Sequence, residues 1–150
     1  SFFFAFKLRH NTSTEYFSFL LVMVICILTD IGGYVFGKIF KGPKLTNYSP
    51  NKTYSGVIGS YAFSITLVPL ILTFGLVNDK DLLNLIFFIF LVSSVSQLGD
   101  ICISYFKRIS KIKDTGKIIP GHGGLLDRID GMIFAFPTIY LINLTEYLNV

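Results

Sequence analysis

Long apolar runs dominate this chain, and four of them are near the roughly 20 mostly apolar residues that a bilayer-crossing helix needs. They cover approximately residues 16–36, 54–77, 82–106 and 132–148. The fourth is the weakest, because its uninterrupted apolar part ends near Leu144. Runs of this length exceed barrel strands, and backbone in lipid must satisfy its own hydrogen bonds. The pattern predicts an all-α fold, a polytopic transmembrane helical bundle that forms a single domain over residues 1–150.

Composition agrees with a chain that has lipid as its main solvent. Hydrophobic residues make up 52% of the 150 residues and charged residues only 15%, whereas a soluble domain carries about a quarter charged residues. Cys26 and Cys102 lie far apart in apolar runs, which excludes the spacing of a zinc site or a disulfide framework. We interpret both cysteines as apolar packing residues.

Positive charge is concentrated in two loops, 38–53 and 107–130, which hold ten of the 13 basic residues. Two predicted spans separate these loops, so both lie on the same side, and the positive-inside rule places that side in the cytosol. We therefore expect both loops to face the cytosol from an inner (plasma) membrane. Anchoring of the lysines to anionic head groups is the alternative explanation of their charge.

Two acids lie within predicted spans, Asp30 in the first and Asp100 near the end of the third. An acid at membrane depth is costly and indicates a functional site by default; a structural acid bonded to a neighbouring helix is the alternative. Gly32 and Gly33 follow Asp30, and we expect them to loosen or kink the helix so that backbone can approach a ligand.

The loop after the third span carries the densest candidate chemistry. Glycines surround His122, and the backbone N–H groups of such a turn can cradle phosphates. Asp127 and Asp130 are three residues apart, hence on one face of a helix that begins there; oxygen ligands of this kind suit a hard divalent cation. The alternatives are a loop His122 that bonds to backbone and an Asp127 that caps the helix. The candidate residues of this loop are Lys107, Arg108, His122, Gly123, Gly124, Asp127, Arg128 and Asp130.

The other basic loop contains Ser49-Pro50-Asn51-Lys52-Thr53 directly before the second span. Lys52 and the hydroxyls of Ser49 and Thr53 could meet phosphates above a helix N-terminus, where the macrodipole favours anions. An ordinary helix start with a capping hydroxyl is the equally open alternative.

These motifs together resemble the phosphatidate cytidylyltransferase (CDP-diacylglycerol synthase) family. The run 104–130 follows the family pattern S-x-x-K-R, then K-D, then P-G-H-G-G-x-x-D-R-x-D, with the spacings kept. Residues 29–34 are similar to its Asp-x-Gly-Ala-Tyr element, 49–53 to Ser-Pro-x-Lys-Thr, and 97–100 to Gln-x-Gly-Asp. The resemblance covers about residues 28–142, the C-terminal portion of the family pattern.

The resemblance implies that CTP and phosphatidic acid give CDP-diacylglycerol and pyrophosphate, with Mg²⁺ and a second, monovalent cation such as K⁺. Carried over by position, the metal ligands are Asp100, Asp127 and Asp130, with Asp30 a further candidate. The implied catalytic groups also include Lys107, Arg108 and His122. The implied substrate-binding residues are Ser49, Lys52, Thr53, Gly123, Gly124 and Arg128. The expected partners are CTP, phosphatidic acid and membrane lipids, without nucleic acid; a homodimer stays open.

The chain departs from the family pattern at two positions near the acids. Ile103 stands where the family usually has Glu, and Gly131 stands where it usually has Ser. Family members also carry further N-terminal spans, so we expect spans upstream of Ser1. These departures keep two alternatives open: a non-catalytic or truncated relative that acts as a membrane scaffold, and an ion or solute transporter.

Overall fold

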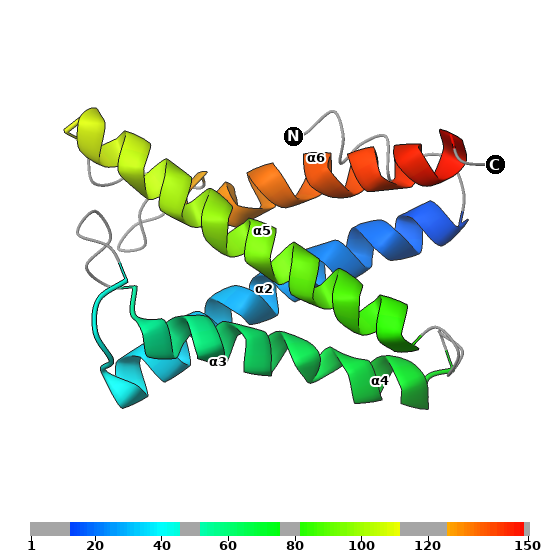
Figure 1. Cartoon of the computed structure of the whole chain (residues 1–150), viewed down its shortest axis with the longest axis horizontal. Helices are drawn as coiled ribbons and strands as arrows, with labels where there is room; N and C mark the ends of the chain where they lie inside the picture. Colours follow the sequence, from blue (N-terminus) through cyan, green and yellow to red (C-terminus); the bar gives the residue numbers. More distant parts are fainter. Residues whose placement is uncertain (1–12, 46–51, 76–81, 112–125, 149–150) are drawn as a thin grey trace. The chain divides into compact units, whose positions relative to one another are not determined.

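The structure, a computed structural model, describes residues 13–45, 52–75, 82–111 and 126–148, and describes side chains over 17–45, 52–75, 82–111 and 130–142. Its elements are five helices, α2 (Ser13–Phe40), α3 (Tyr54–Ile65), α4 (Leu67–Thr73), α5 (Leu82–Ile109) and α6 (Leu126–Leu148) (Figure 1). Within these ranges no β-strand forms, apart from an isolated bridge between Lys44 and Thr53. The predicted all-α fold is confirmed.

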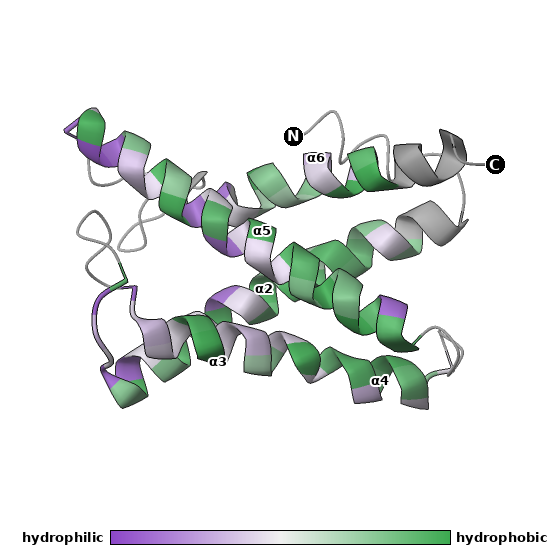
Figure 2. Ribbon diagram, viewed as in Figure 1, coloured by the Kyte–Doolittle hydropathy of each residue, from purple (hydrophilic) through white to green (hydrophobic). Residues whose placement is uncertain are grey.

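Three apolar segments are long enough to cross a membrane, namely Phe17–Phe40, Tyr54–Thr73 and Leu82–Ile109. These helices are hydrophobic along most of their length (Figure 2). They correspond to the first three predicted spans, although α2 continues beyond residue 36 and Thr66 separates α3 from α4. Over the residues with described side chains, α6 contributes a shorter apolar helix, Asp130–Ile142. The fourth span therefore stays a prediction.

The chain divides into two compact units: unit 1 holds residues 1–23 and 95–150, and unit 2 holds residues 24–94. In unit 2 the second part of α2 packs on α3 through glycines. A Cβ added to Gly32 would lie 2.6 Å from the Gly59 carbonyl oxygen, and one added to Gly33 would lie 2.7 Å from the Ser60 hydroxyl. Helix α2 continues through both glycines. The close approach at these glycines is thus made by α3, and the expected approach to a ligand stays a prediction.

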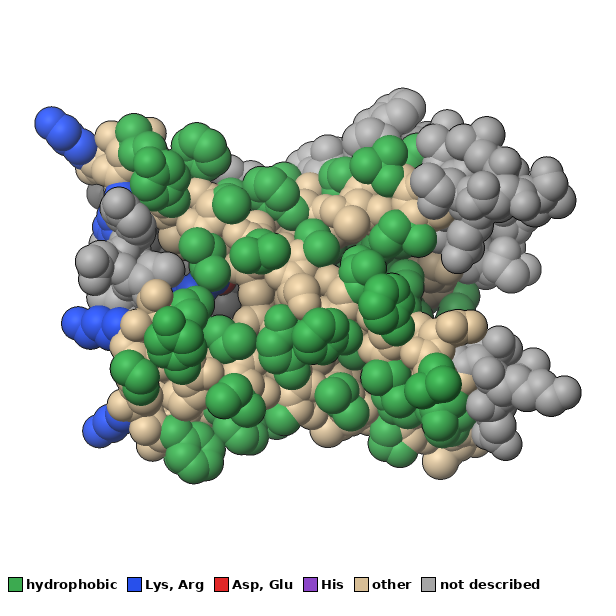
Figure 3. Space-filling view, viewed as in Figure 1, with side chains coloured by type: hydrophobic (Ala, Val, Ile, Leu, Met, Phe, Trp, Pro, Cys, Tyr) green, Lys and Arg blue, Asp and Glu red, His purple; other side chains and the backbone are tan. Residues whose placement is uncertain are grey.

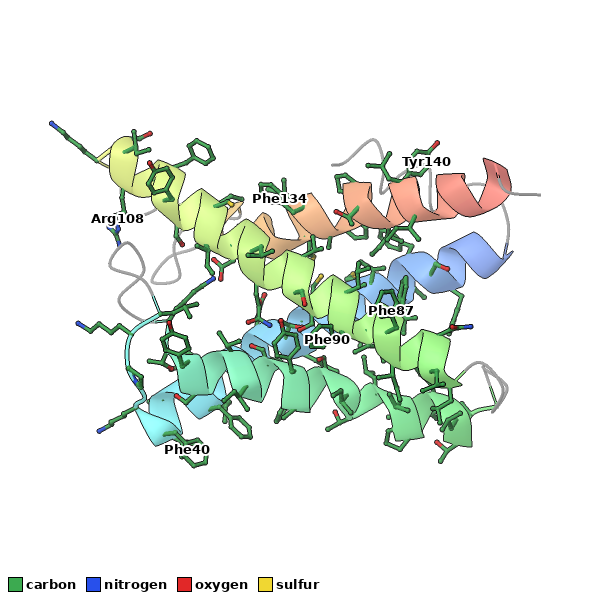
Figure 4. The ribbon with its side chains drawn as sticks, in the orientation of Figure 1. Phe40, Phe87, Phe90, Arg108, Phe134 and Tyr140 are labelled. Atoms are coloured by element: carbon green, nitrogen blue, oxygen red, sulfur yellow. The ribbon has the colours of Figure 1, made fainter. Side chains whose placement is uncertain are left out.

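Buried hydroxyls bind the helices of unit 2 to one another. Thr29 Oγ1 donates a hydrogen bond to Ser93 Oγ at 3.0 Å, and Ser60 Oγ donates to the Thr29 carbonyl at 2.7 Å. The Tyr61 ring stacks on Phe90 at a centroid distance of 4.7 Å, and Phe90 is labelled in Figure 4. Small residues and interhelical hydroxyl bonds are the means by which helices associate in lipid. They fix the second part of α2, α3 and the first half of α5 as one packed unit.

In unit 1 small residues bring the second half of α5 close to α6. A Cβ added to Gly99 would lie 2.8 Å from the Phe134 ring, and Phe134 is labelled on α6 in Figure 4. A Cβ added to Gly131 would lie 3.1 Å from the Ser96 carbonyl oxygen. The contact thus leaves no room for a Cβ at Gly99 or Gly131, each of which is next in sequence to an acid, Asp100 on α5 and Asp130 on α6.

Candidate active site

Two acids that lie 30 positions apart in sequence meet in unit 1. Asp100 and Asp130 share a side-chain hydrogen bond. Asp130 is only 6% exposed, and its Oδ1 also accepts a hydrogen bond from the Gly131 amide at 2.9 Å. The Lys107 ammonium lies 3.7 Å from Asp130 Oδ2. The α5–α6 contact therefore holds two carboxyls and one ammonium within a partly buried cluster, which we call the acid pair site.

Asp130 lies before the predicted fourth span, and its surroundings favour its neutral form. Burial raises the pKa of Asp130 from 3.8 to about 7, and the charge and hydrogen bond of Asp100 act in the same direction. Lys107 and the Gly131 amide lower the pKa by smaller amounts. Near neutral pH Asp130 is thus poised to hold a proton, and a cation placed there would relieve its repulsion by Asp100.

The residue types of the acid pair site fit a divalent cation such as Mg²⁺. Mg²⁺ prefers oxygen ligands and is commonly held by one or two carboxylates together with substrate phosphates. Asp100 and Asp130 supply two carboxylates. The residues with described side chains contain no group of three or more His, Cys, Asp or Glu that could hold an ion. Asp127, the predicted third ligand, has a helical backbone in the first turn of α6, while its side chain lies outside the described residues.

The basic residues at the end of α5 differ in their surroundings. The Lys107 side chain is only 14% exposed and faces Asp130, whereas Arg108 is exposed at the helix end (Figure 4). Both were predicted as catalytic groups from one sequence motif. The structure brings Lys107 to the acids, and it leaves Arg108 at the surface, where it could reach an anionic ligand.

Lys52 and Thr53 lie in unit 2, at the start of α3. Thr53 is the N-cap residue of α3, and its Oγ1 accepts a hydrogen bond from the Gly56 amide at 3.1 Å. The capping interpretation of this threonine is therefore confirmed. The Leu45 amide donates to the Lys52 carbonyl at 2.8 Å, and the Tyr54 amide donates to the Pro43 carbonyl at 3.1 Å. These bonds tie the two ends of the basic loop together beside the helix start.

Asp30 also belongs to unit 2. It is exposed on α2, one residue after the buried Thr29. Lysines follow the C-terminal end of α2, where basic side chains stand out in Figure 3. The predicted Ser49, His122, Gly123 and Gly124 lie outside the described residues, as does the side chain of Arg128.

Comparison with known proteins shows what kind of chain carries this site. A profile of the family described as "Cytidylyltransferase family" matches residues 1–145. The chain belongs to this family. It is 39% identical over 124 residues to the phosphatidate cytidylyltransferase of Staphylococcus haemolyticus, covering 82% of this chain and 47% of that protein.

Relatives from distant bacteria match to a similar degree. The phosphatidate cytidylyltransferase of Brucella melitensis is 38% identical over 135 residues, which cover 89% of this chain and 49% of the relative. That of Haemophilus influenzae is 37% identical over 138 residues, which cover 87% and 48%. The chain thus spans about half the length of the curated relatives that it matches.

Both departures from the cytidylyltransferase pattern fall near the acid pair site. Ile103 is one turn beyond Asp100 on α5, so the spacing places it on the face that carries the acid pair site. Gly131 is buried against Ser96. Sequence reasoning did not select Ser96, although its position four residues before Asp100 was a usable signal.

Proposed function

We propose that this chain is a phosphatidate cytidylyltransferase, which transfers the cytidylyl group of CTP to phosphatidic acid and releases pyrophosphate. The product, CDP-diacylglycerol, would feed phospholipid biosynthesis. The proposal draws on the family membership and on the names of the matched relatives. The observation that carries it is the meeting of Asp100 and Asp130 beside Lys107.

Asp100 and Asp130, with Asp127 from the first turn of α6, are the residues that would hold Mg²⁺. When bound there, Mg²⁺ would neutralise negative charge on the nucleotide phosphates. The buried contact between α5 and α6 supports this assignment, because it fixes the carboxyl oxygens before any substrate arrives. A second, monovalent cation such as K⁺ remains part of the proposal on the family resemblance alone.

The phosphate of phosphatidic acid is already anionic at neutral pH, so it needs no strong general base. One of its oxygens would attack the α-phosphorus of CTP in line with the departing pyrophosphate. The protein's contribution is then positioning and charge stabilisation. Lys107 is placed to stabilise charge next to the acids, and Arg108, His122 and Arg128 are proposed phosphate contacts. Ser49, Lys52, Thr53, Gly123 and Gly124 are proposed to bind substrate.

We propose that the reaction takes place at the cytosolic face of the inner (plasma) membrane. Acyl chains of phosphatidic acid stay in lipid while CTP arrives from water, so the reacting phosphorus must lie at the boundary. Lys107 and Arg108 in the last turn of α5, and Lys38 in the last turn of α2, support this assignment by charge.

An assay of pyrophosphate release from CTP, with phosphatidic acid in detergent and Mg²⁺, tests the function. We expect release that requires both substrates and Mg²⁺. A membrane scaffold or a transporter would release none, and that result would refute the proposal.

Asp127→Asn tests the metal assignment in the same assay. Loss of one charged ligand should lower turnover at least 100-fold while the protein still fractionates with membranes. Thr138→Ala is the matched control on α6, because its hydroxyl only bonds the Phe134 carbonyl of its own helix. Near-normal turnover of Asp127→Asn would remove Asp127 from the site.

A further inference from the structure

Ser96 on α5 has a buried hydroxyl without a hydrogen-bond partner. Its side chain is 0% exposed, and among the residues with described side chains its Oγ is the one buried polar atom that lacks a partner. A buried hydroxyl left without a partner destabilises the fold relative to a satisfied one. Such a group in a native structure calls for a specific explanation, of which a functional role or an absent ion is one.

Other hydroxyls in the same helices find partners within reach. Ser94, two residues earlier on α5, donates to the Phe90 carbonyl at 2.8 Å, and Thr138 on α6 donates to the Phe134 carbonyl at 2.9 Å. Ser93, equally buried, accepts from Thr29. Bonding to the carbonyl one turn earlier is the usual solution for a helical serine. The Ser96 hydroxyl is instead directed against Gly131 of α6.

This position borders the acid pair site on both helices. Ser96 precedes Asp100 by one turn, on the same face of α5. Gly131, which Ser96 contacts, directly follows Asp130 and gives its amide hydrogen bond to that carboxyl. A packing role alone would be filled better by alanine, which is as small and leaves no polar atom unsatisfied.

We propose that Ser96 is a positioning residue of the acid pair site, whose hydroxyl donates a hydrogen bond to the Asp130 carboxylate when a divalent cation is bound. The inference rests on the proposed function, since it assumes that Asp100 and Asp130 hold the cation. A cation held by the two carboxylates would replace the hydrogen bond that Asp130 shares with Asp100. Rotation of the Ser96 side chain then supplies a new partner to the carboxylate.

The test measures Mn²⁺ binding, with Mn²⁺ as a spectroscopic probe for the divalent site, by electron paramagnetic resonance on the full chain in detergent. We expect Ser96→Ala to bind Mn²⁺ at least tenfold more weakly, the usual effect of removing a residue that orients a metal ligand. Its melting temperature without metal should equal or exceed that of the unmutated chain. Ser93→Ala is the matched control: losing its bond to Thr29 should lower the melting temperature and leave Mn²⁺ affinity unchanged.

Two outcomes would overturn the role of Ser96 while leaving the proposed function intact. One is wild-type Mn²⁺ affinity in Ser96→Ala, and the other is a fall in affinity accompanied by an equal loss of thermal stability, as a packing role predicts. Mn²⁺ binding by the unmutated chain and by Asp100→Asn shows whether the proposed cation site itself is wrong, rather than only the role of Ser96. If the unmutated chain binds no Mn²⁺, or if Asp100→Asn binds it equally well, the cation site and the role of Ser96 both fall.

Discussion

Replacing Asp130 with Asn should stabilise the protein in the absence of metal while impairing its function. Burial and the nearby Asp100 raise the pKa of Asp130 from 3.8 to about 7. The unfolded chain releases this proton near pH 4, and the folded chain keeps it until pH about 7. Folding stability therefore falls as the pH rises from 4 to 7, and the full cost is present above pH 7. Asn, which carries no charge, avoids this cost.

The pKa difference sets the expected magnitude. A shift of this size corresponds to about 4 kcal/mol. We halve this to about 2 kcal/mol, because the substitution also takes away the charged partner of the partly buried Lys107. For a chain of this length, about 2 kcal/mol raises the melting temperature by roughly 4–8 °C.

The assay is thermal unfolding of both proteins in detergent with a chelator, at pH 8 and at pH 4. We expect the Asn variant to melt higher at pH 8 and the difference to be much smaller at pH 4, where the folded unmutated chain holds the proton and the unfolded chain is only about half ionised. Added Mg²⁺ should stabilise only the unmutated chain. A variant that is less stable at pH 8, or a difference that does not change with pH, would refute the proposed electrostatics of the site.

The packing of unit 2 gives two further predictions. Thr53→Ala should cost about 1 kcal/mol of stability through loss of the cap to the Gly56 amide; Thr53→Ser should restore it, and equal melting temperatures for all three proteins would contradict the cap. Gly59→Val should cost at least about 2 kcal/mol, because its added Cβ would overlap the Phe36 ring. The exposed Ala62→Val on the same helix is its control, expected within about 0.5 kcal/mol of the unmutated chain; similar losses in both would contradict the close contact.

The helices themselves were predictable, because apolar length alone specifies them in lipid. One interruption was not predicted: Thr66 separates α3 from α4 within a continuous apolar run. Pro69 was a usable signal for it, because proline has no amide to bond the Ile65 carbonyl four residues earlier. The role of Gly32 and Gly33 was also only partly predictable from the sequence. Sequence shows that these residues permit close approach, but it does not show that the approaching backbone belongs to Gly56 and Gly59.

The residues of the acid pair site could be predicted from the sequence better than their arrangement in space. Sequence motifs selected Asp100, Asp130 and Lys107, which the structure brings together. They did not distinguish Lys107 from Arg108. Adjacent residues of a helix point in different directions, and which of the two faces the acids depends on where the neighbouring helix lies. Ser96 belongs to none of the sequence motifs. It was noticed only because its buried hydroxyl has no hydrogen-bond partner in the structure.

The paired backbone around Lys44 and Thr53 has a consequence for how this enzyme family can vary. Two hydrogen bonds clasp the chain on either side of residues 46–51. Helix α3 is thus anchored independently of what lies between them. Insertions and exchanges in that stretch are therefore expected to leave the start of α3 where it is.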